Sequence, residues 1–257
     1  MSLWSRERIE VRLSPHSVAL RRLARGARAR ELGRYQFGVG AVDGTHDWKP
    51  ALTLLNSKFE ALAWRKVDLE IVLSGHYTRL MLMPWTADVS ERDAAAYARH
   101  QFDAVYGSNA AAWNICLGVA HPRRPRIMAA AERSLIEALT ALAASYEMRL
   151  CSVRPMLSVL VDALPVTEEA LSGWVALLEP GGVHVACLDA GHCIDIRGAR
   201  YEAEPASTLL SLLSESALNT DRDTDNAQVK LYAAVAPDSS LLREHGWRVE
   251  HATLEFA

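Results

Sequence analysis

The sequence predicts a two-lobed α/β protein in which one fold occurs twice and a small subdomain is inserted into the first copy. Three observations support this prediction. Strand and helix patterns alternate along the chain, a meander of three strands opens each half, and the first half contains an additional strand–helix–strand segment. The chain has 257 residues, of which 50% are hydrophobic and 23% charged. This length and composition are typical of a globular protein with a sizeable core.

The first half opens with a predicted hairpin. Hydrophobic residues alternate over residues 8–23 and are interrupted by Ser14-Pro15-His16, which predicts two strands and a turn. A third strand is expected over 35–42, and a fourth over 69–73 after a helix. The apolar side chains of that helix recur at spacings of four and three residues. They are Trp48, Leu52, Leu55, Phe59 and Leu62.

The inserted subdomain is predicted at about residues 76–120. It comprises a strand over 77–83, a helix over 90–106 and a strand over 113–117. Ser90 and Asp93 resemble a capping box at the start of the helix. The expected buried face of the helix consists of Ala94, Ala98, Phe102 and Val105.

The rest of the first lobe, residues 1–164, is predicted as strand–helix–strand–helix, with Pro155 in the first turn of the last helix. The second lobe, residues 165–257, repeats the three-strand opening and then alternates helix and strand. Its expected strands lie at 174–178, 183–188, 193–197, 228–235 and 247–253, with helices starting at Pro205 and at Pro237.

The segments Arg126–Ala131 and Met148–Pro155, each followed by a helix pattern, resemble the passage that closes the first lobe in the actin-like ATPase superfamily. Within it the chain is similar to the type IV pilus assembly protein PilM and the cytoplasmic domain of the type II secretion protein GspL. The resemblance implies a duplicated ribonuclease H-like (actin-like) fold. It also implies a bacterial scaffold that assembles such a machine through protein components, including a cytoplasmic segment of an inner-membrane protein.

In that superfamily two glycine-containing acidic turns and a later Gly-Gly loop hold ATP and its metal. Here the first turn has Ser14 and His16 around a proline, and the second is Glu179-Pro180-Gly181-Gly182. The third connection, Val235-Ala236-Pro237-Asp238, has no glycine. We therefore expect a pseudo-ATPase with no catalytic residue, no metal and no cofactor. The alternative is an active ATPase or sugar-kinase relative.

In PilM-like proteins a partner's cytoplasmic segment docks on the first lobe, and the resemblance implies the same role here for the insert and the basic surface near it. Tyr77, Met81, Met83 and Trp85 alternate along the predicted strand and place an aromatic and methionine row on one face. Arginines could frame a carboxylate of the partner. These are Arg79 and Arg99. The alternative interpretation is that the row forms the core of the subdomain itself.

Nine arginines lie within residues 1–34. The cluster around the predicted connection to the third strand comprises Arg21, Arg22, Arg25, Arg28, Arg30 and Arg34. Such a loop could bind nucleic-acid phosphates. Arginine is abundant throughout this chain, however, and no aromatic residue interrupts the cluster for base stacking. We therefore favour a solvated or protein-docking connection over nucleic-acid binding.

Two further features concern metals and location. His184, Asp189, His192, Cys193 and Asp195 lie within twelve residues, but their positions along two strands favour an ordinary hairpin over a metal site. No apolar run reaches the roughly 20 residues that cross a bilayer, and no secretory region follows Met1. We expect a cytoplasmic protein, peripheral to the inner membrane only through a partner, whose four cysteines are reduced and buried.

Overall fold

A computed structural model describes residues 7–24, 30–40, 47–164, 172–202, 204–225 and 227–254. The chain divides into two compact units. One contains the residues up to Thr78 together with Ala131–Met156, and the other contains Arg79–Ala130 together with the residues from Leu157 onward. Residues 79–130 thus group with the second half of the chain. The expected boundary between 1–164 and 165–257 stays a prediction.

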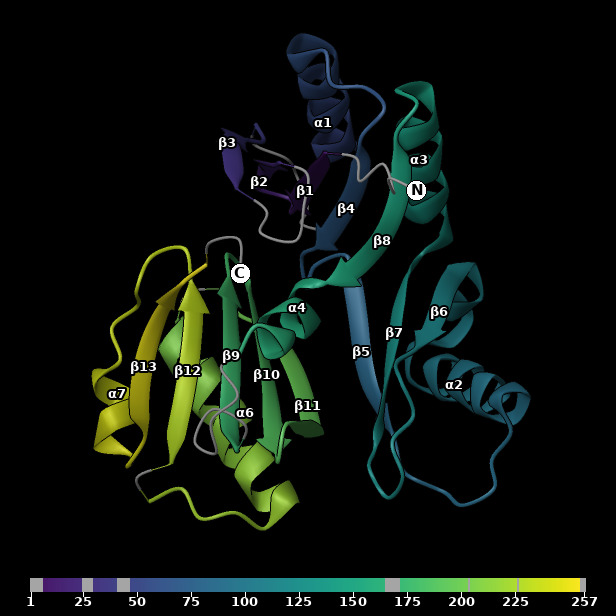
Figure 1. The fold of residues 1–257 in the computed structure, drawn as a ribbon. Helices are drawn as coiled ribbons and strands as arrows, with labels where there is room; N and C mark the ends of the chain where they lie inside the picture. Colours follow the sequence, from purple (N-terminus) through teal and green to yellow (C-terminus); the bar gives the residue numbers. More distant parts are fainter. Residues whose placement is uncertain are drawn as a thin grey trace. The chain divides into compact units, whose positions relative to one another are not determined.

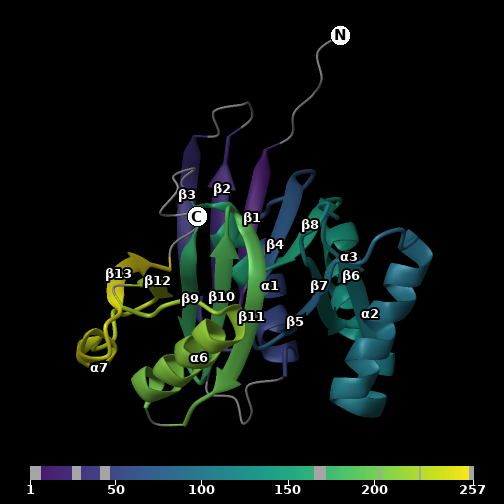
Figure 2. The same cartoon turned by 90° about the horizontal axis from the view of Figure 1, so that it is seen from below.

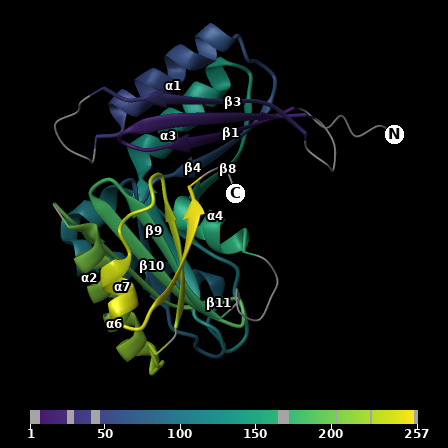
Figure 3. The ribbon, with the colours of Figure 1, turned by 90° about the vertical axis from the view of Figure 1, so that its left-hand side faces the viewer.

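The first unit is built on a five-stranded sheet. Its strands are β1 (Arg8–Leu13), β2 (Ser17–Leu23), β3 (Glu31–Gly38), β4 (Asp68–Leu73) and β8 (Arg149–Pro155). Their order is β3-β2-β1-β4-β8; β1 is antiparallel to β2 and parallel to β4. The helices α1 (Lys49–Leu62) and α3 (Arg133–Ser145) cover one face of this sheet (Figure 3).

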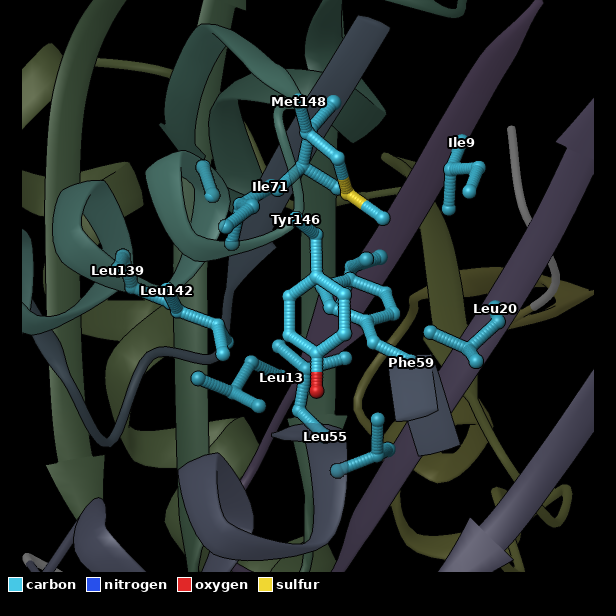
Figure 4. Packing of buried hydrophobic residues seen from close by; sticks show 14 of the residues in the cluster. Ile9, Leu13, Leu20, Leu55, Phe59, Ile71, Leu139, Leu142, Tyr146 and Met148 are labelled. Atoms are coloured by element: carbon cyan, nitrogen blue, oxygen red, sulfur yellow. The ribbon is translucent and has the colours of Figure 1, made fainter. Parts of the chain in front are cut away.

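The core of the first unit lies between the sheet and these two helices (Figure 4). Every second residue of β1 and β4 is buried, which directs one face of each strand into the core. Phe59 of α1 contacts the ring of Tyr146 at 5.6 Å between centroids. The Tyr146 hydroxyl donates to the carbonyl of Asn56 at 3.1 Å, so the polar tip of this buried ring is satisfied.

The second unit contains a sheet of the same design. Its strands are β9 (Gly173–Glu179), β10 (Gly182–Asp189), β11 (His192–Arg200), β12 (Gln228–Ala233) and β13 (Arg248–Thr253). The order β11-β10-β9-β12-β13 repeats that of the first sheet strand for strand. α6 (Pro205–Thr220) covers one face and α4 (Met156–Asp162) the other, while α7 (Ser240–Glu244) precedes β13 (Figures 1 and 3). The predicted duplication is confirmed.

The inserted subdomain has a three-stranded sheet of its own, in the order β5-β7-β6. Its elements are β5 (Thr78–Met83), α2 (Glu91–Tyr106), the 3-10 helix η1 (Gly107–Ala112), β6 (Trp113–Leu117) and β7 (Arg126–Glu132). Helix α2 packs beside these strands (Figure 2), with Phe102 fully buried. The subdomain therefore needs β7, which lies beyond the predicted insert. Val105 is 59% exposed instead of buried.

The arginine cluster differs most from its prediction. Arg21 and Arg22 lie in β2 and Arg34 in β3, which begins at Glu31, four residues before the expected start. The burial alternation of β2 is interrupted at Arg21 and Arg22, which are both half-buried, and the pairing with β3 shifts register between Arg22 and Leu23. Arg21 pairs with Glu10, Arg22 with Glu7, and Arg34 with Glu31. The prediction that the arginines lie in a connecting loop is thus wrong for Arg21, Arg22 and Arg34. Arg30 is exposed, and Arg25 and Arg28 lie outside the described residues.

Candidate functional site

The turn between β1 and β2 stands where the actin-like fold would have its first phosphate loop. Ser14 and Ser17 close this turn on themselves. The Ser14 amide donates to the Ser17 carbonyl at 3.0 Å, and the Ser17 amide donates to Ser14 Oγ at 2.9 Å. Pro15 has no N–H. His16 supplies the one remaining amide of this four-residue turn, so little of its backbone is free to surround a phosphate.

The turn between β9 and β10 stands at the second phosphate-loop position. Glu179 and Gly182 pair across the strands, and only Pro180 and Gly181 connect them. Gly181 has a φ of 78°, which together with the preceding proline is typical of a type II turn. Tyr201 donates its hydroxyl to the Glu179 carbonyl at 2.9 Å. The pairing of the two strands therefore continues up to this two-residue turn.

The connection after β12 stands where an adenosine loop would follow. Asp238 accepts the Ser240 amide at 2.9 Å in the turn before the short helix α7. The same hydrogen bond is the main reason that the pKa of Asp238 lies below its usual value. Ser239 is buried and hydrogen-bonds His251 Nε2 at 2.9 Å. The side chains of Asp238 and Ser239 thus form hydrogen bonds within the second unit.

The predicted partner row is divided by the structure. Tyr77 is buried in the core of the first unit, and Met81 and Met83 pack half-buried against the core of the inserted subdomain. Trp85 is exposed beyond the end of β5. For the two methionines this matches the alternative interpretation, in which the row is the subdomain's own core. The partner-binding role of the set stays a prediction.

The two arginines of that prediction lie on different elements. Arg79 is half-buried in β5, and Arg99 is exposed on α2. Neither lines the groove described next.

A groove with a volume of about 650 Å³ opens at the end of β5. It is bounded by the residues that follow β5, by the first two turns of α2 and by the connection between β6 and β7. Three exposed hydrophobic side chains line it: Trp85 is 47% exposed, Val89 42% and Tyr97 37%. A cavity of this size with aromatic walls is typical of a binding site. Of the predicted partner residues, it contains Met83 and Trp85.

Arg126 holds this groove in shape. Its guanidinium donates to both carboxylate oxygens of Glu91 at 3.0 and 2.9 Å and to the Gly118 carbonyl at 2.6 Å. These bonds tie the first turn of α2 to β7 and to the end of β6. Ser90 caps the helix by accepting the Asp93 amide at 3.2 Å, as the sequence predicts.

Arg124, on the groove's other wall, connects it to the second sheet. Asp189 accepts from Arg124 at 2.6 Å and from Arg222 at 2.7 Å. The hydrogen bond from Arg124 is the largest factor that lowers the pKa of Asp189. Beside this ion-pair cluster the ring of His121 contacts that of His192, with centroids 4.8 Å apart. Desolvation, followed by the charges of His121 and Arg124, lowers the pKa of His192.

The residues weighed as metal ligands serve other roles. Asp189 binds two arginines, and Asp195 accepts from Arg197 at 2.8 Å and from Asn219 at 2.9 Å. Within the described ranges no three His, Cys, Asp or Glu side chains converge as a metal site would require. No helix of the described chain is long and apolar enough to cross a membrane.

Comparison with known proteins identifies the fold. No protein-family model matches this sequence, and no curated protein matches it. A solved protein of unknown function with an actin-like ATPase fold, from Bacteroides thetaiotaomicron, matches with a TM-score of 0.67 at 11% identity. The match covers 96% of this chain and 91% of that one. This chain has the actin-like ATPase fold.

Two further structures with this fold belong to assembly machines. The cytoplasmic domain of EpsL, an inner-membrane component of the type II secretion system of Vibrio cholerae, matches at 15% identity with a TM-score of 0.62. The match covers 96% of this chain and 90% of that one. The PilM–PilN type IV pilus biogenesis complex matches at 9% identity with a TM-score of 0.66, covering 95% and 87%. The resemblance predicted from the sequence is confirmed at the level of the fold.

Sequence reasoning missed most of the groove. Val89, Tyr97, His121 and Arg124 were not singled out, because nothing local distinguishes an exposed tyrosine on a helix from a buried one. Tyr97 follows the buried Ala94 by three positions and so matches the pattern of the buried face. The available signal was Trp85, a large apolar residue in the loop that ends five residues later at the helix cap Ser90.

Proposed function

We propose that this protein is a non-catalytic actin-like scaffold, a pseudo-ATPase, in the assembly of a type IV pilus or type II secretion-like machine. It acts in the cytoplasm, at the inner membrane only through its partners. Those partners are protein components of the apparatus, including a cytoplasmic segment of an inner-membrane protein. The likeness of the fold to the EpsL domain and to PilM supports this role.

The observation that carries the non-catalytic part is the turn between β1 and β2. An actin-like ATPase needs backbone amides that approach phosphate and an acid that holds the metal or its water. In this chain Ser14 and Ser17 bond to each other and Pro15 supplies no amide. The Pro180-Gly181 hairpin supports the same conclusion, because its strands pair up to the turn itself.

Thermal unfolding with and without Mg-ATP tests this part. A ligand at a hundredfold excess over its dissociation constant stabilises a folded protein by about 2.7 kcal/mol. We expect no change in Tm with millimolar Mg-ATP relative to magnesium alone. A rise of several degrees with Mg-ATP, absent with Mg-AMP, would show that the protein binds the nucleotide and would reject the pseudo-ATPase proposal.

Affinity capture from the native cell tests the scaffold part. We expect the tagged protein to retain a component of a pilus or secretion apparatus, and to retain it equally after apyrase has removed nucleotides. Loss of that component on nucleotide depletion would contradict a nucleotide-independent scaffold. Capture of metabolic enzymes alone would contradict the assembly role.

A further inference from the structure

We propose that the groove of the inserted subdomain binds an apolar segment of a partner protein that carries a lysine or arginine. This inference rests on the proposed scaffold role and adds the chemistry of the segment that docks. It is carried by three features of the groove, which are its exposed apolar walls, the hydrogen bonds that join two of its walls and the charge that its own ion pairs leave unneutralised.

The apolar walls come from two different elements. Trp85 and Val89 belong to the stretch that links β5 to α2, and Tyr97 lies in the second turn of α2. All three are exposed although they are large and hydrophobic. Exposed apolar side chains that gather around a hollow are characteristic of an interaction site. Tryptophan and tyrosine also provide a large contact area while losing little side-chain entropy.

Hydrogen bonds join two walls of the groove, although the Glu91 side chain is 74% exposed. The Arg126 side chain is only 11% exposed and binds Glu91 with two parallel hydrogen bonds. Bidentate pairs of this kind add geometric specificity to their energy. A partner segment therefore meets two walls that are already joined, which lowers the entropic cost of binding.

The charges in the groove select the sign of the partner. Both arginines in the wall already have a carboxylate partner, Arg126 in Glu91 and Arg124 in Asp189, which also binds Arg222. Two carboxylates have no cation of their own. Asp93 accepts only the Ser90 hydroxyl, at 2.6 Å, and Asp88 has no ion pair or hydrogen bond with any residue that the structure describes.

A cationic side chain fits these surroundings best. It can reach the two free carboxylates while its aliphatic stem lies along the apolar walls, and an ammonium or guanidinium group is attracted to tryptophan and tyrosine faces. An acidic segment would instead approach Asp88 and Asp93 without an available arginine. The helix N-terminus does not reverse this preference, because Glu91 and Asp93 already occupy its first turn.

Peptide selection on the full-length protein tests the inference directly. Random dodecamer peptides displayed on phage are selected on the immobilised protein, and the enriched sequences are then synthesised as fluorescent probes. We expect enriched peptides to combine aliphatic or aromatic residues with at least one lysine or arginine. Their affinity should fall at least tenfold for Trp85→Ala, and several-fold for Asp88→Asn, whose asparagine tolerates the φ of 61° at this position.

Val119→Ala is the matched control, since Val119 is 77% exposed in the same subdomain and does not line the groove. It should leave the affinity unchanged, and all three variants should keep the native Tm. Enrichment of acidic peptides, no enrichment at all, or equal binding by Trp85→Ala would overturn the inference. If the groove variants still capture the native partner, the groove is rejected while the scaffold role stands. If the groove variants lose the native partner but its capture depends on nucleotide, the nucleotide-independent scaffold role is rejected while the groove stands.

Discussion

The two five-stranded sheets have the same strand order, but their outer faces are opposite in chemistry. In the first sheet, the face away from α1 and α3 carries charged residues that pair across the strands. Glu10 of β1 pairs with Arg21 of β2, and Arg8 pairs with Glu10 at 3.4 Å and with Glu70 of β4 at 3.2 Å. In the second sheet, the corresponding residues of β9 and β10 are apolar and buried. They are Val175, Leu177, Ala186 and Leu188.

The difference shows that one topology accommodates two kinds of burial. β1 and β4 alternate between buried and half-buried residues, whereas β9 is buried at six consecutive positions. α4 explains the contrast, because it lies on the face of the second sheet opposite α6 (Figure 1). Leu157 and Leu160 of α4 are buried. The two sheets thus share a strand order, while the polarity of each outer face depends on whether a helix covers that face.

The largest effect is expected when the apolar outer face is truncated. Leu177 is completely buried. Leu177→Ala should lower the free energy of unfolding by about 2–5 kcal/mol, because it removes apolar contacts and leaves a cavity. Denaturant unfolding followed by circular dichroism measures the change. Leu218→Ala serves as control, because Leu218 is 84% exposed and should change stability by less than about 0.5 kcal/mol. Equal effects would mean that this face is not packed.

A smaller effect is expected on the charged outer face. Glu10→Ala removes the carboxylate that pairs with Arg21, whose side chain is only 15% exposed. The largely buried guanidinium then loses this carboxylate, which should cost about 1–3 kcal/mol. The exposed pair Lys66–Glu147 provides the control, because its side chains are 71% and 60% exposed. Glu147→Ala should cost less than about 1 kcal/mol. If Glu10→Ala leaves the free energy of unfolding unchanged, the ion pair between Glu10 and Arg21 does not stabilise this face.

The fold could be predicted from the sequence because its signals are local. Ser90 caps α2 where expected, β6 has the predicted bounds, and the hydrophobic strand patterns that begin each half predicted the repeated meander. Ends of elements were less accurate, since α7 begins at Ser240 and not at Pro237. Asp238 accepts the Ser240 amide in the turn before this helix, a contact that depends on the folded turn.

The groove could be predicted only in part, because its walls come from residues that are distant in sequence. Trp85 and Arg124 are 39 positions apart and meet only because β5 and β7 are neighbours in the small sheet. The burial of the cysteines could also be predicted only in part from the sequence. Cys187 and Cys193 are buried, which raises their pKa to about 11 and about 12, but Cys116 and Cys151 are exposed. The expectation that all four are buried is thus wrong for two, since strand patterns do not show which edge stays uncovered.

The two sheets also differ in the connection between their second and third strands. A substitution at this connection is expected to have the smallest effect on stability. β2 and β3 are separated by residues 24–30, whereas only Ala190 and Gly191 separate β10 from β11. The shorter connection is held by Asp189 and by the contact between His192 and His121.

Burial, His121 and Arg124 disfavour a positive charge on His192, and Asp189 only partly offsets them, so the pKa of His192 lies below its usual value of 6.5 in the folded protein. In the unfolded chain the same ring titrates at about 6.5. Between these two values the unfolded state binds more protons, so the free energy of unfolding decreases as the pH falls below about 6.5. The pKa of Asp189 is already far lower, so this carboxylate stays charged throughout that window.

We therefore expect His192→Gln to reduce the loss of stability between pH 7.5 and pH 5.5. Urea unfolding of the native chain and the variant at several pH values measures the two slopes. His245→Gln is the control, since His245 is exposed and bonds only to the Leu241 carbonyl of its own helix. If His192→Gln and the native protein lose stability equally on acidification, protonation of His192 does not contribute to the pH dependence of the free energy of unfolding.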